Sequence, residues 1–220
     1  MTRDDSIGDR SGAILNEAWR LISGSPFTVA GYLAVMVGFA MVADMRPQDR
    51  AFELGLSLVD FGALFVLTMQ LIQNGIEGGR RGRRGIFAYL GLTLLSGLGI
   101  VIGFVLLVLP GLILLARWSA AYGYLLGDGE GVTSALEESW DATTGHTVPV
   151  MLAFLASILL TISGITAAYF LSDEFDMITP VGSLLSNALM YGGSALSTAI
   201  GLAVFSLLAR QDVAVAEVFE

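Results

Sequence analysis

Six long apolar segments restrict the fold of this chain more than any other feature of its sequence. Each approaches or exceeds the roughly 17–25 apolar residues that a helix needs to cross the hydrocarbon core of a bilayer. Hydrocarbon offers no partner to free N–H and C=O groups, so such segments cross as helices that satisfy their own backbone. The predicted spans are residues 26–43, 51–73, 86–108, 111–127, 147–171 and 183–209.

Composition agrees with a chain embedded in a membrane. Hydrophobic residues make up 55% of the 220 residues and charged residues 14%, whereas about 25% of a typical soluble protein is charged. This excludes a water-soluble globule, a disordered chain and a nucleic-acid binder. Since the chain has no cysteine, one histidine and no evident nucleophile–base pair, we expect no metal, no cofactor and no catalytic residues.

The connection between the third and fourth segments is Leu109-Pro110-Gly111. Proline lacks an N–H and glycine tolerates unusual dihedral angles, which together favour a tight turn at this point. The fourth segment is short. Two separate spans, one long kinked segment and a re-entrant pair therefore all remain open for residues 86–127.

Arginine placement predicts the orientation of the spans, because cytoplasmic loops of membrane proteins carry an excess of positive charge. With the N-terminus inside, only Arg46 and Arg50 fall outside, and Arg117 falls within a span. Both termini are then cytoplasmic. The arginines on the cytoplasmic side are Arg3, Arg10, Arg20, Arg80, Arg81, Arg83, Arg84 and Arg210.

Half of those cytoplasmic arginines form one dense cluster just before the third span. Setting the topology is one role for them, and attraction of anionic lipid headgroups, worth about 1 kcal/mol per arginine near the surface, is a compatible second role. The predicted headgroup-binding residues are Arg80, Arg81, Arg83 and Arg84.

Two segments have the pattern of amphipathic helices lying at the cytoplasmic interface. Residues 11–24 place apolar side chains on one face, with Glu17 and Arg20 opposite, and residues 131–145 repeat this arrangement. Each carries a tryptophan, a residue that anchors at headgroup depth. Trp19 and Trp140 are the predicted interfacial anchors.

Three polar residues within the spans are candidates for function, namely Asp60, Arg117 and Asn187. A charge at membrane depth is costly and is either functional or paired inside the bundle. Asp60 is therefore a proton or cation site, or an internal partner of Arg117 or of hydroxyl groups. Arg117 forms an ion pair, extends to the interface, or contacts a substrate.

Small and polar residues recur at helical spacing along the last two spans. These stripes predict faces directed into the bundle, which either line a small wet cavity or hold neighbouring helices together. Whether the small residues pack within the chain or between subunits is open. The stripes are Ser157, Thr161 and Gly164, then Ser183, Asn187, Tyr191, Ser194 and Thr198, with small-x3-small spacing in Gly99-Gly103 and in Gly193-Ser197-Gly201.

One part of the sequence resembles a known family. The matching residues are Leu109-Pro110-Gly111, Arg117-Trp118, Ala135-Leu136-Glu137-Glu138-Ser139-Trp140 and Thr144-Gly145-His146. They resemble a bacterial and archaeal family of polytopic membrane proteins that includes the membrane domain fused to some glycerophosphoryl diester phosphodiesterases. The resemblance implies a bundle of about six spans with cytoplasmic termini, and it implies no catalytic residues. The expected location is a bacterial inner (plasma) membrane.

The predicted fold is an all-α membrane protein, with a bundle of about six transmembrane helices plus two cytoplasmic interfacial amphipathic helices in one domain. The first functional hypothesis is a non-enzymatic scaffold or accessory protein associated with lipids or a membrane complex. The alternative is a small permease or lipid-handling transporter that uses polar faces of the second, fifth and sixth spans. Expected partners are membrane lipids, anionic ones included, and a homo- or hetero-oligomer, with no nucleic acid.

Overall fold

The computed structural model describes the backbone of residues 6–45, 50–76, 85–172 and 178–218, and the side chains of these ranges up to residue 208. The described residues form helices and no β-sheet strand. In chain order the helices are α1 (Ile7–Gly24), α2 (Pro26–Asp44), α3 (Arg50–Gly75), α4 (Ile86–Leu106), α5 (Val108–Arg117), α6 (Ala121–Gly123), the π-helix η1 (Tyr124–Asp128), α7 (Val132–Ala142), α8 (Thr147–Phe170) and α9 (Pro180–Val218).

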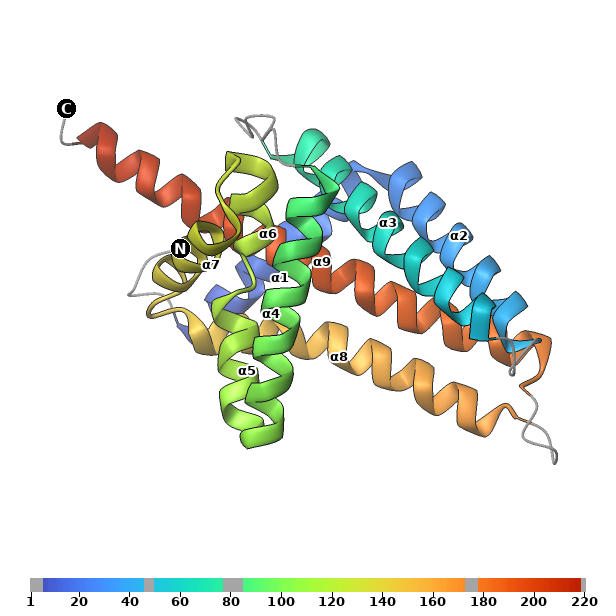
Figure 1. Cartoon of the computed structure of the whole chain (residues 1–220). Helices are drawn as coiled ribbons and strands as arrows, with labels where there is room; N and C mark the ends of the chain where they lie inside the picture. Colours follow the sequence, from blue (N-terminus) through green and yellow to red (C-terminus); the bar gives the residue numbers. More distant parts are fainter. Residues whose placement is uncertain (1–5, 46–49, 77–84, 173–177, 219–220) are drawn as a thin grey trace.

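Six helical stretches of the described chain are long and apolar enough to cross a membrane, which confirms the prediction of a multi-pass all-α membrane protein. They are α2, α3, α4, the stretch Val108–Asp128 made of α5, α6 and η1, α8, and Pro180–Leu208 of α9. Figure 1 shows α2, α3, α8 and α9 running in a common direction, with α4 and α5 crossing them.

Helix α9 is the centre of the bundle. It contacts α1, α2, α3, α6 and α8, and its segment from Ala199 to Phe205 is almost entirely buried. Its closest neighbour is α8. A Cβ atom on Gly164 of α8 would lie 2.7 Å from the Ser186 carbonyl oxygen, and one on Gly193 of α9 would lie 3.0 Å from the Ser157 carbonyl oxygen. The two backbones therefore approach directly through reciprocal glycines.

The small residues predicted to let helices approach do so within this chain. Gly103 of α4 faces Gly111 of α5, where an added Cβ would lie 2.9 Å from the Gly111 Cα. Gly99 faces the ring of Trp118, and Gly201 of α9 faces the Ser119 carbonyl oxygen. Within the described part of the chain, these small residues therefore pack against helices of the same chain.

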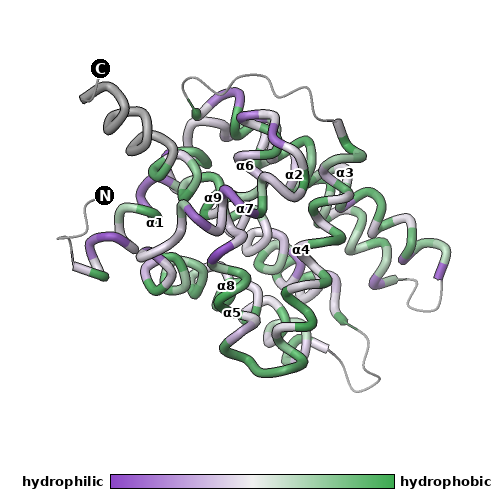
Figure 2. The backbone as a smooth tube through the Cα atoms, turned by 60° about the vertical axis from the view of Figure 1, so that its left-hand side comes forward, coloured by the Kyte–Doolittle hydropathy of each residue, from purple (hydrophilic) through white to green (hydrophobic). Residues whose placement is uncertain are grey.

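The predicted turn at Leu109-Pro110-Gly111 is wrong in position. The chain reverses at Leu107, which is extended with φ −163° and ψ 147° and separates α4 from α5. Pro110 lies instead in the first turn of α5, where its missing N–H costs no hydrogen bond because that N–H would have no partner inside the helix. The apolar turn itself is exposed, and Figure 2 shows this end of the α4–α5 pair as hydrophobic.

The fourth predicted span is broken rather than continuous. Helix α5 ends at Arg117, residues 118–120 form a turn, and α6 and η1 complete the stretch to Asp128. Gly129 then adopts a left-handed conformation with φ 80°, which lets the chain turn into α7. Residues 86–127 are therefore two apolar stretches, Ile86–Leu106 and Val108–Asp128, rather than one long kinked segment, and the second of them is interrupted at residues 118–120.

Helix α1 is packed more tightly than a helix resting on a membrane surface. It starts at Ile7, earlier than the predicted 11–24, because Ser6 caps it by accepting a hydrogen bond from the Asp9 N–H. Its buried face contains Ile14, Ala18 and Leu21 and contacts α3, α8 and α9. Figure 1 shows α1 and α7 near the same end of the bundle.

Candidate functional site

A cavity of about 260 Å³ lies between α3, α4, the α5–α6 break and α9. Eight of the sixteen described residues that line it carry a hydroxyl group. An adjoining groove of about 410 Å³ shares Ser197 and Thr198 with it and continues between α8 and α9. Of the stripes predicted on the last two spans, Ser157, Thr161, Ser194 and Thr198 therefore border a hollow, whereas Gly164 packs directly against α9. The hydroxyl-bearing residues of the cavity wall are Thr68, Tyr89, Thr93, Ser96, Ser119, Tyr122, Ser197 and Thr198.

At one end of α9 a carboxylate from α2 joins two polar side chains of the stripe. The Asp44 carboxylate accepts hydrogen bonds from the Ser183 hydroxyl at 2.5 Å and from the Asn187 side-chain amide at 2.9 Å. Asn187 also donates to the Ser183 carbonyl oxygen at 2.9 Å and is buried. We call these three residues the Asp44 cluster. Asn187 was predicted, whereas Asp44 was missed because an acid at the end of a span looks like an ordinary loop residue.

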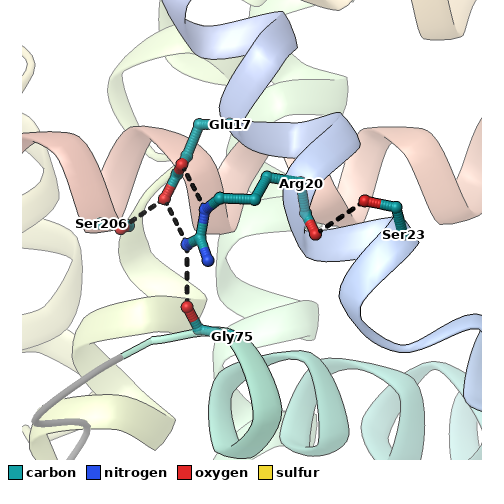
Figure 3. Close-up of polar contacts among 5 residues, drawn as sticks. All are labelled: Glu17, Arg20, Ser23, Gly75 and Ser206. Atoms are coloured by element: carbon teal, nitrogen blue, oxygen red, sulfur yellow. Dashed lines mark hydrogen bonds and ion pairs between the residues drawn. The ribbon is translucent and has the colours of Figure 1, made fainter.

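Near the other end of the apolar stretch of α9, Pro180–Leu208, lies a second polar cluster, drawn in Figure 3 and here called the Glu17 cluster. The Glu17 carboxylate of α1 accepts from the Ser206 hydroxyl at 2.9 Å and from the Arg20 guanidinium at 2.7 Å through both oxygens. Arg20 also donates to the Gly75 carbonyl oxygen at 2.8 Å. Because this carbonyl ends α3, it has no partner inside its helix and attracts a positive charge.

The Glu17 cluster corrects the expected role of these two side chains. The sequence places them on the water-facing side of an interfacial helix, yet the Glu17 side chain is only 11% exposed. Glu17 joins α1 to α9, and Arg20 joins α1 to α3 (Figure 3). Helical periodicity could not reveal this, because Ser206 and Gly75 are distant in the sequence.

Asp60 and Arg117 do not form a pair with each other. The Tyr32 hydroxyl of α2 lies 3.4 Å from the Asp60 carboxylate, so the described partner of Asp60 is a phenol. Arg117 donates instead to the Trp140 carbonyl oxygen at 3.0 Å and to the Thr144 hydroxyl at 2.6 Å. Its guanidinium also lies 4.9 Å from the centre of the Trp140 ring, a cation–π distance.

Ser139 of α7 closes the break between α5 and α6. Its hydroxyl donates to the Arg117 carbonyl oxygen at 2.7 Å and accepts from the Ala120 N–H at 3.1 Å. Both backbone groups lie at the interruption of the helix and would otherwise be buried without this partner. The residues that carry the family resemblance, Arg117 and Ser139-Trp140 with Thr144, therefore meet in one contact between α5 and α7.

The structure describes the two predicted tryptophan anchors but not the predicted headgroup-binding arginines. Trp19 is 68% exposed and lies off the packed face of α1, while Trp140 is 38% exposed and packs on Arg117. The predicted headgroup-binding arginines, Arg80, Arg81, Arg83 and Arg84, lie outside the described residues.

Comparison with known proteins adds no family to this description. No protein-family model, no curated protein and no solved structure matches the chain. In the ranges that the structure describes, no three histidine, aspartate or glutamate side chains come together as a metal ion would require. The fold and the site together define a multi-pass helical membrane protein with a hydroxyl-lined cavity beside its central helix.

Proposed function

We propose that the protein is a small, non-enzymatic permease that moves a solute along α9. The observation that carries the proposal is the order of features on this one helix. The Asp44 cluster involves residues 183 and 187, the cavity involves residues 197–202, and the Glu17 cluster involves residue 206. Ser183 and Ser206 are about 34 Å apart along a helix that rises 1.5 Å per residue, close to the roughly 30 Å hydrocarbon thickness.

The two clusters are suited to close the two ends of such a route. Each joins α9 to a different helix through a carboxylate, the Asp44 cluster to α2 and the Glu17 cluster to α1. A hydrogen bond to a charged group contributes about 1.5–3 kcal/mol. A conformational change that forms new contacts of similar energy can therefore break one of these clusters. Opening one cluster while the other stays closed would expose the cavity to one side at a time.

Several further properties belong to the same proposal. The protein lies in a bacterial inner membrane with cytoplasmic termini, bound to anionic lipids through the arginine cluster and related to the phosphodiesterase-associated membrane family. Arg10 donates to the Gly145 carbonyl oxygen at 3.2 Å and Arg20 donates to that of Gly75. These contacts support the orientation, since they gather arginines at the end of the bundle that positive charge assigns to the cytoplasm.

Cysteine accessibility tests the permease directly, because the native chain contains no cysteine. We expect Ser197→Cys, in the cavity wall, to react with a membrane-impermeant maleimide in proteoliposomes. Glu17→Gln should raise its reaction from the side of α1, and Asp44→Asn from the opposite side. Ala153→Cys, which is fully buried and outside the cavity wall, is the matched control. Equal protection of both cysteines in every background would reject the proposal.

The scaffold hypothesis remains the second candidate, favoured by the outer surface of α2 and α3. Two hollows of about 600 and 400 Å³ meet there at Val35. Gly31, Gly38 and Gly62 border them, and a Cβ on any of the three would meet no heavy atom within 4 Å. Packing against the described residues of this chain therefore does not explain why these positions are glycine. At membrane depth, a lipid acyl chain is a suitable occupant of the two hollows. Loss of co-purifying lipid in Gly62→Leu, with Ser197→Cys unreactive, would favour the scaffold.

A further inference from the structure

Six of the eight hydroxyl groups that line the cavity are left as oxygen acceptors, because their hydrogens are already donated within the protein. Four of them lie within hydrogen-bond distance of a backbone carbonyl oxygen of their own helical segment. A carbonyl oxygen carries no hydrogen, so the hydroxyl must donate and is left with its lone pairs. The distances are 2.7 Å from Thr68 to the Leu64 carbonyl, 2.6 Å from Ser96 to Leu92, 2.8 Å from Ser119 to Ala116 and 3.0 Å from Thr198 to Ser194.

Two more hydroxyl groups donate their hydrogens in a short chain of hydrogen bonds. Thr93 lies 2.9 Å from the Tyr89 carbonyl oxygen and therefore donates to it. The Tyr122 hydroxyl lies 3.2 Å from the Thr93 hydroxyl, whose hydrogen is already used, so Tyr122 donates to Thr93. Six lining hydroxyl hydrogens are thus committed to the protein itself, while each oxygen retains at least one lone pair.

The remaining surroundings of the cavity favour positive charge. Trp118 and Phe154 form part of its wall, and aromatic faces attract cations. Among the described residues that line it, none is basic, and Arg117 is held against α7. Asp60 lies one helical turn before Leu64, a wall residue, on the same face of α3. A negative charge at this depth acts through a low dielectric constant.

We infer that this cavity binds a small organic ammonium ion. The N–H groups of such a ligand donate to the lone pairs of these six hydroxyl groups, and its charge is stabilised by the aromatic side chains and by Asp60. For an anion the wall offers fewer donors than acceptors, at most the hydroxyl groups of Tyr89 and Ser197 and the indole N–H of Trp118. The inference rests on the proposed permease function for its biological use, since the ammonium ion is then the transported solute, but the binding itself is measurable without transport.

Protection of a cysteine in the cavity tests this binding. The probe solutes are n-butylammonium, butyrate and n-butanol, which share a carbon chain and differ in charge and donor groups. We expect n-butylammonium to slow alkylation of Ser197→Cys in the purified protein, and we expect butyrate and n-butanol to have no effect. Equal protection by butyrate or n-butanol, or no protection by any of the three, would overturn the inference.

Matched variants assign the effect to the hydroxyl oxygens. Thr68→Val and Thr198→Val, each in the Ser197→Cys background, remove a lone-pair acceptor with little change of shape. Each should raise the half-protecting concentration of n-butylammonium about tenfold, because a hydrogen bond from a charged donor contributes about 1.5 kcal/mol. Thr166→Val, exposed on α8 and outside the cavity wall, should change nothing. If Thr68→Val and Thr198→Val leave the half-protecting concentration unchanged, as Thr166→Val should, the hydroxyl oxygens do not bind the ammonium ion.

The outcome separates this inference from the permease proposal. If n-butylammonium protects Ser197→Cys but the cysteine is reached from neither side of the membrane, the binding site stands and the permease fails. If the cysteine is reached from the two sides in turn but no ammonium selectivity is seen, the permease stands and the ammonium assignment fails.

Discussion

Replacing Gly164 by alanine should destabilise the protein by separating its two most closely packed helices. The added Cβ atom would lie 2.7 Å from the Ser186 carbonyl oxygen and 2.9 Å from the Met190 backbone nitrogen of α9. Both contacts are shorter than the roughly 3.5–4.0 Å optimum for non-bonded atoms, and backbone atoms cannot rotate away. Overpacking of this kind costs about 1–3 kcal/mol.

The assay is thermal unfolding of the detergent-solubilised protein, followed by tryptophan fluorescence. For a chain of this size, 1 kcal/mol changes the Tm by about 2–4 °C, so Gly164→Ala should lower the Tm by about 2–12 °C. Gly38→Ala is the matched control, because its Cβ meets open space. Alanine is the better helix former by up to about 1 kcal/mol, and the control should therefore keep or raise the Tm.

A side-chain variant distinguishes the backbone contact from the Met190 side chain, whose Cγ would lie 2.6 Å from the added atom. In a double-mutant cycle with Met190→Ala, the penalty of Gly164→Ala should persist, because the Ser186 carbonyl oxygen is unchanged. The reasoning is refuted if Gly164→Ala unfolds at or above the Tm of Gly38→Ala. A penalty that disappears beside Met190→Ala would show that the side chain, not the backbone, limits the approach.

Three further variants test the polar joints. Ser139→Ala removes the partner of the Ala120 N–H, so the free energy of unfolding should fall by about 2 kcal/mol; the exposed Ser163→Ala is the control for the measured Tm. Arg117→Lys keeps the charge but loses the planar group that lies against Trp140, so amide hydrogen exchange in α7 should accelerate and unchanged exchange would contradict the contact. Glu17→Gln weakens the joint of α1 with α9, so exchange in α1 should accelerate, whereas the exposed Glu138→Gln should match the wild type.

The second hypothesis and the arginine cluster suggest a lipid experiment. Replacing Arg80, Arg81, Arg83 and Arg84 by glutamine should weaken binding to vesicles that contain anionic lipid, since each arginine near such a surface contributes about 1 kcal/mol. Binding measured at rising salt is the check, because the electrostatic part is screened. Equal binding of the variant and the wild type, with intact topology, would leave the cluster a role in orientation alone.

Apolar length by itself determined the class of this protein. A helix in hydrocarbon must satisfy its own backbone, so segments such as 147–171 specify their structure locally, and the observed α8 (Thr147–Phe170) departs from the prediction by one residue. Periodicity also identified the stripe on the last span that faces into the bundle, where Ser183 and Asn187 are buried.

Tertiary structure alone decided which polar groups meet. Sequence placed Asp60 and Arg117 at membrane depth, but their partners, Tyr32 and Trp140 with Thr144, depend on how separate helices pack. The position of the turn at Leu107 and the break after Arg117 also depend on how the helices pack. Pro110 is tolerated at the start of a helix, and the backbone groups freed by the break find Ser139, a residue on another helix. Backbone satisfaction inside a helix is local and readable from sequence, whereas contacts between helices depend on distances that no sequence spacing encodes.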